Sequence, residues 1–119
     1  MKDQLFDDLQ QLGLDMEEIM DRFMEDKELY ISCLERFMEE DTFDQLRDRI
    51  DDQEYEGAFN CAHSLKGVSA NLGLHDLYDA VCRMVEPLRA KQYDNLSKLY
   101  EDIVVEKAKI AQAIANNQE

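Results

Sequence analysis

Apolar residues recur at intervals of three and four along almost the whole chain, and only one proline and four glycines interrupt the pattern. Residues three or four apart lie on the same side of an α-helix, so this spacing builds helices that each have one apolar face. Such helices bury these faces by packing together, and short connections make neighbouring helices antiparallel. The sequence therefore predicts an all-α protein, an antiparallel up-down four-helix bundle with an additional short N-terminal helix.

Turn-forming and capping residues divide the pattern into five expected helical segments, at residues 15–24, from 26 to 51–53 (either continuous or restarting at 41–42), 54–72, 75–92 and from 94 onward. Asp15 is the expected N-cap of the first segment, with Glu18 completing a capping box. Gly73 is expected to end the helix before it in a left-handed conformation. Pro87 lacks a backbone N–H, so we expect a kink or a break near residues 83–86.

Composition limits the size of the fold and its partners. The chain has 119 residues, 45% of them hydrophobic, and we expect one core and a single domain over residues 1–119. The net charge of -15 repels nucleic-acid phosphates and anionic lipid, so neither is an expected partner. No apolar run reaches membrane-spanning length, and residues 1–6 lack a secretory pattern. The three cysteines are odd in number and widely spaced, which indicates buried thiols in a reducing cytoplasm.

One segment carries a pattern that points to chemistry, residues 62–73, Ala-His-Ser-Leu-Lys-Gly-Val-Ser-Ala-Asn-Leu-Gly. His63, Lys66 and Gly67 stand at positions i, i+3 and i+4 of the expected helix, so they form one surface patch. At about 100° per residue, His63 lies roughly 120° from the centre of the apolar face, and Lys66 lies near its edge. The patch therefore combines a nucleophile, a cation and a position without a side chain.

The neighbours of His63 leave the imidazole approachable. Asn60 and Ala70 lie on its exposed side. Gly67 costs about 0.5–1 kcal/mol relative to alanine inside a helix, and no turn is needed there. Such a glycine is useful if another protein's active site must come close; the alternative is a glycine that lets two helices of this chain approach each other. We expect Asn60, Gly67 and Ala70 to form a surface on which a partner docks.

A patch of this kind suits a transferable phosphoryl group. A neutral imidazole is a nucleophile near pH 7, and Lys66 can offset phosphoryl charge through charge-assisted hydrogen bonds. No acidic cluster suited to magnesium and no glycine-rich phosphate loop accompanies it. Asn60 and Leu72 stand where a di-iron bundle would need the glutamate of Glu-x-x-His. We therefore expect a phosphoryl carrier rather than an enzyme, with no cofactor or metal of its own. His75 is expected to be a surface or capping residue rather than a second phosphorylation site.

Residues 62–73 closely resemble the motif of the histidine-containing phosphotransfer (HPt) domain family. The resemblance extends through Gly13-Leu14-Asp15 and residues 22–37, and it covers about residues 12–92. It implies a four-helix bundle in a two-component phosphorelay, in which His63 is phosphorylated on Nε2, Lys66 steadies the phosphoryl group and Gly67 clears space. The implied partners are response-regulator receiver domains and a histidine kinase or hybrid kinase. The receiver brings the phosphorylated aspartate, the magnesium ion and the catalytic lysine.

Several alternatives are open from the sequence. An adaptor bundle that binds receiver or kinase domains without phosphotransfer is the alternative function. The dimerisation helix of a sensor kinase is disfavoured, because Gly67-Val68 stands where that helix has a proline. Arg83 and Arg89 either add positive potential near the patch or pair with acidic neighbours. The chain is either a free-standing relay protein or a piece of a hybrid kinase, and a monomer is expected because no leftover apolar stripe is evident.

Overall fold

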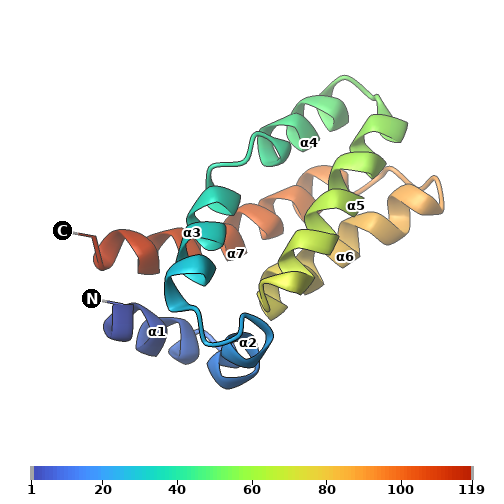
Figure 1. The fold of residues 1–119 in the computed structure, drawn as a ribbon. Coiled ribbons are helices and arrows are strands. Elements are labelled where there is room, and N and C mark those ends of the chain that lie inside the picture. The colour runs from blue at the N-terminus through green and yellow to red at the C-terminus, as the bar shows by residue number, and fades with distance from the viewer. Residues whose placement is uncertain (1, 119) are drawn as a thin grey trace.

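The computed structural model describes residues 2–118, and this part of the chain forms seven helices and no strand (Figure 1). The helices are α1 (Lys2–Gln11), α2 (Met16–Arg22), α3 (Lys27–Met38), α4 (Thr42–Asp51), α5 (Tyr55–Asn71), α6 (His75–Arg89) and α7 (Leu96–Asn116). The prediction of an all-α fold is confirmed. None of the helices in the described chain is long and apolar enough to cross a membrane.

Helices α4, α5, α6 and α7 build the bundle that the apolar pattern predicts. α5 packs against α4 and α6, while α7 packs against α6 and also contacts α4. At the contact between α4 and α7, the Tyr100 hydroxyl donates to the Phe43 carbonyl at 3.0 Å, and Lys107 Nζ lies 4.4 Å from the centre of the Phe43 ring. A single apolar cluster joins side chains from all seven helices of the described chain.

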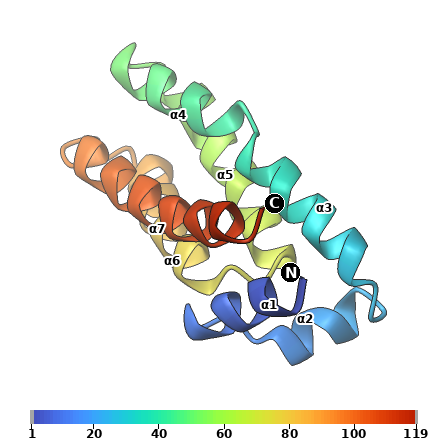
Figure 2. The ribbon, with the colours of Figure 1, turned by 90° about the vertical axis from the view of Figure 1, so that its left-hand side faces the viewer.

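The first long helix of the bundle is split in two. α3 ends at Met38 and a new helix begins at Thr42, which is the second of the two expected alternatives. The rings of Phe37 and Phe43 lie 5.3 Å apart across the break, so the core continues through it. α3 also contacts α7, and Figure 2 shows α3 extending beyond α4 toward the end of the molecule that carries α1 and α2.

The predicted short N-terminal helix is α2, and its predicted cap is confirmed. The Asp15 carboxylate accepts a hydrogen bond from the Glu18 backbone N–H at 3.1 Å. The Glu18 carboxylate pairs with Arg22 at 2.9 Å, and this pairing replaces the return half of the expected capping box. The ion pair of Glu18 with Arg22 therefore competes with the hydrogen bond that the Glu18 side chain would make to the N-cap residue.

Helix α1 is not among the helices expected from the sequence pattern. Its residues Leu5 and Leu9 are buried, and the helix packs against α7 and α2. Asn117 Nδ2 donates to the Asp8 carboxylate at 2.9 Å, which draws the two ends of the chain together (Figures 1 and 2). This short polar helix is held by tertiary contacts that the local pattern does not specify.

Two residues were expected to interrupt the helices: Gly73, after α5, and Pro87, in α6. Gly73 has φ +71°, and the N–H groups of Gly73 and Leu74 donate to the carbonyls of Ala70 and Ser69, so the predicted left-handed cap is confirmed. A break near residues 83–86 does not occur, because α6 runs without interruption to Arg89, and the other expected alternative, a kink there, stays a prediction. Pro87 lies in the last turn of α6, and its missing N–H removes one intrahelical hydrogen bond.

Candidate functional site

His63 lies near the middle of α5, and its side chain is exposed. One turn earlier, the half-buried Phe59 stacks on it, with the ring centroids 5.8 Å apart and the planes inclined by 28°. Arg89 of α6 places its guanidinium carbon 5.7 Å from the centre of the Phe59 ring. The imidazole is therefore supported by an aromatic ring on the α6 side and remains accessible to a protein that approaches from solvent.

Lys66 follows His63 by three residues and is half-buried. In such a position the aliphatic part of a lysine packs on the bundle while the ammonium reaches outward. Among residues 2–118, no carboxylate pairs with this ammonium. The buried Ser69 hydroxyl donates to the carbonyls of Leu65 and Lys66, at 2.7 and 3.1 Å. This buried polar side chain therefore has hydrogen-bond partners within α5. The positive charge is thus available to an incoming anion.

Gly67 is exposed, and a Cβ atom built on it would meet no other atom within 4 Å. Gly57 and Gly73 differ from Gly67 in this respect. A Cβ at Gly57 would lie 3.0 Å from Arg49 Cδ, and one at Gly73 would lie 2.6 Å from the Ile19 side chain. The alternative in which Gly67 lets two helices of this chain approach each other is therefore wrong. No contact within the described chain requires a glycine there.

Asn60 and Ala70 are also exposed, on the turns before and after His63. Asn60 borders a hollow of about 540 Å³ between α4 and α5. In this hollow, Arg49 pairs with Glu54 at 2.6 Å. The structure thus brings the expected docking residues onto the same exposed side of α5 as His63.

Two residues that the sequence analysis did not assign to the site hold the C-terminal end of α5. Arg22 of α2 donates to the carbonyls of Ala70 and Asn71, at 3.0 and 2.8 Å, and the buried Tyr30 hydroxyl donates to the Leu72 carbonyl at 2.7 Å. Burial raises the pKa of the Tyr30 hydroxyl far above its ordinary value. α5 has no basic residue in its last turn, so partners distant in sequence satisfy its free carbonyls.

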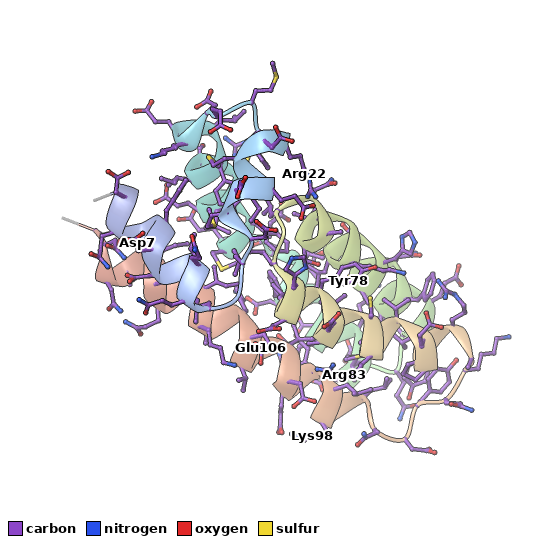
Figure 3. All side chains as sticks on the ribbon, turned by 90° about the horizontal axis from the view of Figure 1, so that it is seen from below. Asp7, Arg22, Tyr78, Arg83, Lys98 and Glu106 are labelled. Carbon is purple, nitrogen blue, oxygen red and sulfur yellow. The ribbon has the colours of Figure 1, made fainter. Side chains whose placement is uncertain are left out.

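The remaining candidates of the sequence lie apart from this patch or on its border. Arg89 reaches the patch through Phe59, whereas Figure 3 shows Arg83 on the side of α6 toward α7. His75 is exposed at the first position of α6. All three cysteines are half-buried free thiols. No group of three or more potential metal ligands occurs in the described part of the chain.

The comparisons with known proteins agree with this arrangement. A family model described as the Hpt domain matches residues 18–116. The match begins within α2 and ends at the last residue of α7, so it includes the whole bundle and the exposed histidine. No curated protein and no solved structure matched the chain.

Proposed function

The chain belongs to the Hpt domain family, whose members carry phosphoryl groups in two-component signalling, and from this we propose that it is a phosphorelay intermediate that works through His63. The observation that supports this role best is the grouping of an exposed imidazole, an unpaired ammonium and an open glycine on consecutive turns of α5. An imidazole can accept a phosphoryl group and release it again only where another active site can reach it. This grouping provides that access.

The transfer that we propose exchanges one bond to phosphorus for another. The lone pair of His63 Nε2 attacks the phosphorus of an aspartyl phosphate, a P–N bond forms, and the P–O bond to the carboxylate breaks. The aspartate leaves as a carboxylate, and Nδ1 keeps the ring proton, so that Nε2 is free to attack. Reversal of the same step passes the phosphoryl group to a second aspartate. No cofactor of this chain is needed, and the partner receiver supplies its own magnesium ion.

Lys66 and Gly67 have distinct roles in this proposal. The Lys66 ammonium stabilises the negative phosphoryl oxygens, which gain charge-assisted hydrogen bonds in a site partly shielded from water. Gly67, with Asn60 and Ala70 beside it, lets the receiver's active site come within bonding distance of the imidazole. The expected partners are response-regulator receiver domains and a histidine or hybrid kinase.

Replacement of the nucleophile tests this function. After incubation with a radiolabelled, phosphorylated receiver domain, the wild-type protein should carry acid-labile, base-stable phosphate, and His63→Gln should carry none. His75→Gln is the matched control, since it removes the only other histidine and should keep the label. Label that persists in His63→Gln would refute the assignment. Receiver binding without any label on the wild-type protein would favour the adaptor function instead.

A further inference from the structure

The C-terminal end of α5 is held by partners from outside the helix. An α-helix leaves its last carbonyls without intrahelical partners, and each buried one needs another donor. The carbonyls of residues 68–70 accept from backbone N–H groups at the end of α5 and in the turn that follows, at 3.0 to 3.1 Å. The carbonyls of Asn71 and Leu72 have no backbone donor in the described chain. They depend on Arg22 and Tyr30 instead.

Arg22 is fixed in the geometry that this end of α5 requires (Figure 3). Its Nη1 donates to the carbonyls of Ala70 and Asn71, while its Nη2 pairs with Glu18 at 2.9 Å. The guanidinium places a positive charge at the negative end of the α5 dipole, where α5 has no basic residue of its own. Ala70 is two turns after His63 and on the same side of the helix. Arg22 therefore supports the side of α5 that carries the imidazole.

Tyr30 holds the same end from the core. It is fully buried, and its ring packs edge-on against Phe6 and Phe23, with the centroids 6.1 and 5.0 Å apart. This packing fixes the hydroxyl, whose proton goes to the Leu72 carbonyl at 2.7 Å. A buried carbonyl without a donor is costly, so this bond keeps the residue after α5 in place.

The segment that these two side chains hold begins beside Lys66 and Gly67. In an α-helix each N–H donates to the carbonyl four residues earlier, so the Ala70 N–H binds the Lys66 carbonyl. The Ser69 hydroxyl donates to the same carbonyl at 3.1 Å. Gly67 weakens the helix at this point, because glycine has more backbone freedom to lose than other residues. Opening of the end of α5 would therefore spread back to the turn that carries Lys66.

The charge of Arg22 acts too far from the imidazole to matter directly. A helix rises about 1.5 Å per residue, so Ala70 lies roughly 10 Å along α5 from His63. The Debye length is about 8 Å at physiological salt, so the guanidinium attracts a phosphoryl group on His63 only weakly. An effect of Arg22 on transfer must pass through the backbone of α5.

On these grounds we propose that Arg22 and Tyr30 are positioning residues for phosphoryl transfer. By closing the end of α5, they hold the turn that carries Lys66 and so keep its ammonium within reach of a phosphoryl group on His63. The inference rests on the phosphorelay function proposed above. Neither residue touches the reacting atoms.

Amide hydrogen exchange tests the closure of α5 without any phosphotransfer. Arg22→Gln and Tyr30→Phe should each speed exchange at residues 70–74 about tenfold, while residues 58–62 of the same helix exchange as in the wild type. Tyr30→Phe keeps the buried ring and removes only the hydroxyl. Arg36→Gln is the matched control, because it removes one positive charge from an exposed side chain of α3. Unchanged exchange at residues 70–74, or equal acceleration along all of α5, would overturn the inference.

Transfer from a phosphorylated receiver domain tests the positioning itself. Arg22→Gln and Tyr30→Phe should each lower the maximal rate about threefold and leave the receiver concentration at half-maximal rate within about twofold of wild type. Arg36→Gln should leave both unchanged. A higher half-saturation with an unchanged maximal rate would show that Arg22 serves docking, and it would overturn the proposal. If Tyr30→Phe does not fold, as judged by circular dichroism, Arg22→Gln decides by itself.

A double variant shows whether the effect passes through Lys66. In a Lys66→Ala background, Arg22→Gln should change the maximal rate by less than about 1.5-fold, because no ammonium is left to position. A full threefold loss in that background would refute the positioning role. Absence of label on wild-type His63 is a different result, since it would refute the phosphorelay function and leave the exchange data as they are.

Discussion

The ammonium of Lys66 is one turn from the imidazole and has no carboxylate partner in the described chain, so its charge serves no ion pair of the fold. A hydrogen bond to a charged group contributes about 1.5–3 kcal/mol. Lys66→Ala should therefore slow phosphoryl transfer at saturating receiver about tenfold or more, while the far-ultraviolet circular dichroism stays that of the wild type. Lys66→Arg keeps the charge and should retain most of the rate. An unchanged rate in Lys66→Ala would rule out the electrostatic role.

Gly67 lowers the stability of α5 without relieving any contact in the described chain. Gly67→Ala should therefore stabilise the fold by about 0.5–1 kcal/mol, because alanine loses less backbone entropy in a helix. Thermal denaturation should show a rise in Tm of about 2–4 °C. A fall in Tm would revive the explanation that Gly67 serves helix packing.

The same position should respond differently to a large acidic side chain. Gly67→Glu points into solvent, so it should fold like the wild type, but its bulk and charge stand where the receiver approaches. The receiver concentration at half-maximal transfer should rise about tenfold. Gly67→Ala serves as the control for loss of the glycine alone, and equal transfer by both variants would show that the receiver does not pass over this turn.

The residues of the patch could be predicted from sequence because helical spacing alone brings His63, Lys66 and Gly67 together. Arg22 and Tyr30 could not, since they lie 48 and 42 residues from the carbonyls of Ala70 and Leu72 that they bind. The only available signal was indirect, namely the lack of a basic residue in the last turn of α5. Contacts of this kind depend on how helices are placed in space.

At the scale of the helix, the C-terminal end of α5 depends on Gly73 for two separate reasons. Its φ of +71° is strained for other residues, and a Cβ would lie 2.6 Å from the buried side chain of Ile19. Gly13 has φ +98° and nothing within 4 Å of its Cβ position, so only its backbone conformation requires glycine. In urea denaturation, Gly13→Ala should cost about 1–2 kcal/mol and Gly73→Ala about 1–3 kcal/mol more. Equal losses would mean that Ile19 moves aside freely.

The helices that the sequence predicted well are those whose ends carry local signals. Asp15 and Gly73 act through neighbours within a few residues, so their effects could be predicted directly, whereas the restart at Thr42 was one of two alternatives that the sequence left open. The break expected at Pro87 does not occur, because its missing N–H removes a single hydrogen bond from α6, which continues to Arg89. α1 went unpredicted because its apolar side chains become significant only once α7 lies beside them.

Over the whole molecule, acidic residues outnumber basic ones by 28 to 13, and the described ion pairs lie at the surface. Surface pairs contribute little, about 0–1 kcal/mol each, whereas an excess of one sign of charge destabilises the compact state through repulsion. These two terms respond to salt in opposite directions, because screening weakens both attraction and repulsion. Stability against ionic strength therefore shows which of them dominates in this protein.

We expect repulsion to dominate, because the excess of 15 negative charges (28 minus 13) has no basic partners. Raising NaCl from about 0.02 M to about 0.5 M should increase Tm by several degrees, since the Debye length falls from above 20 Å to below 5 Å. Asp51→Asn removes a negative charge from the C-terminal turn of α4, where the helix dipole also disfavours it. It should raise Tm at low salt, and this gain should disappear at high salt. A wild-type Tm that falls with added salt would show instead that the surface ion pairs hold this bundle together.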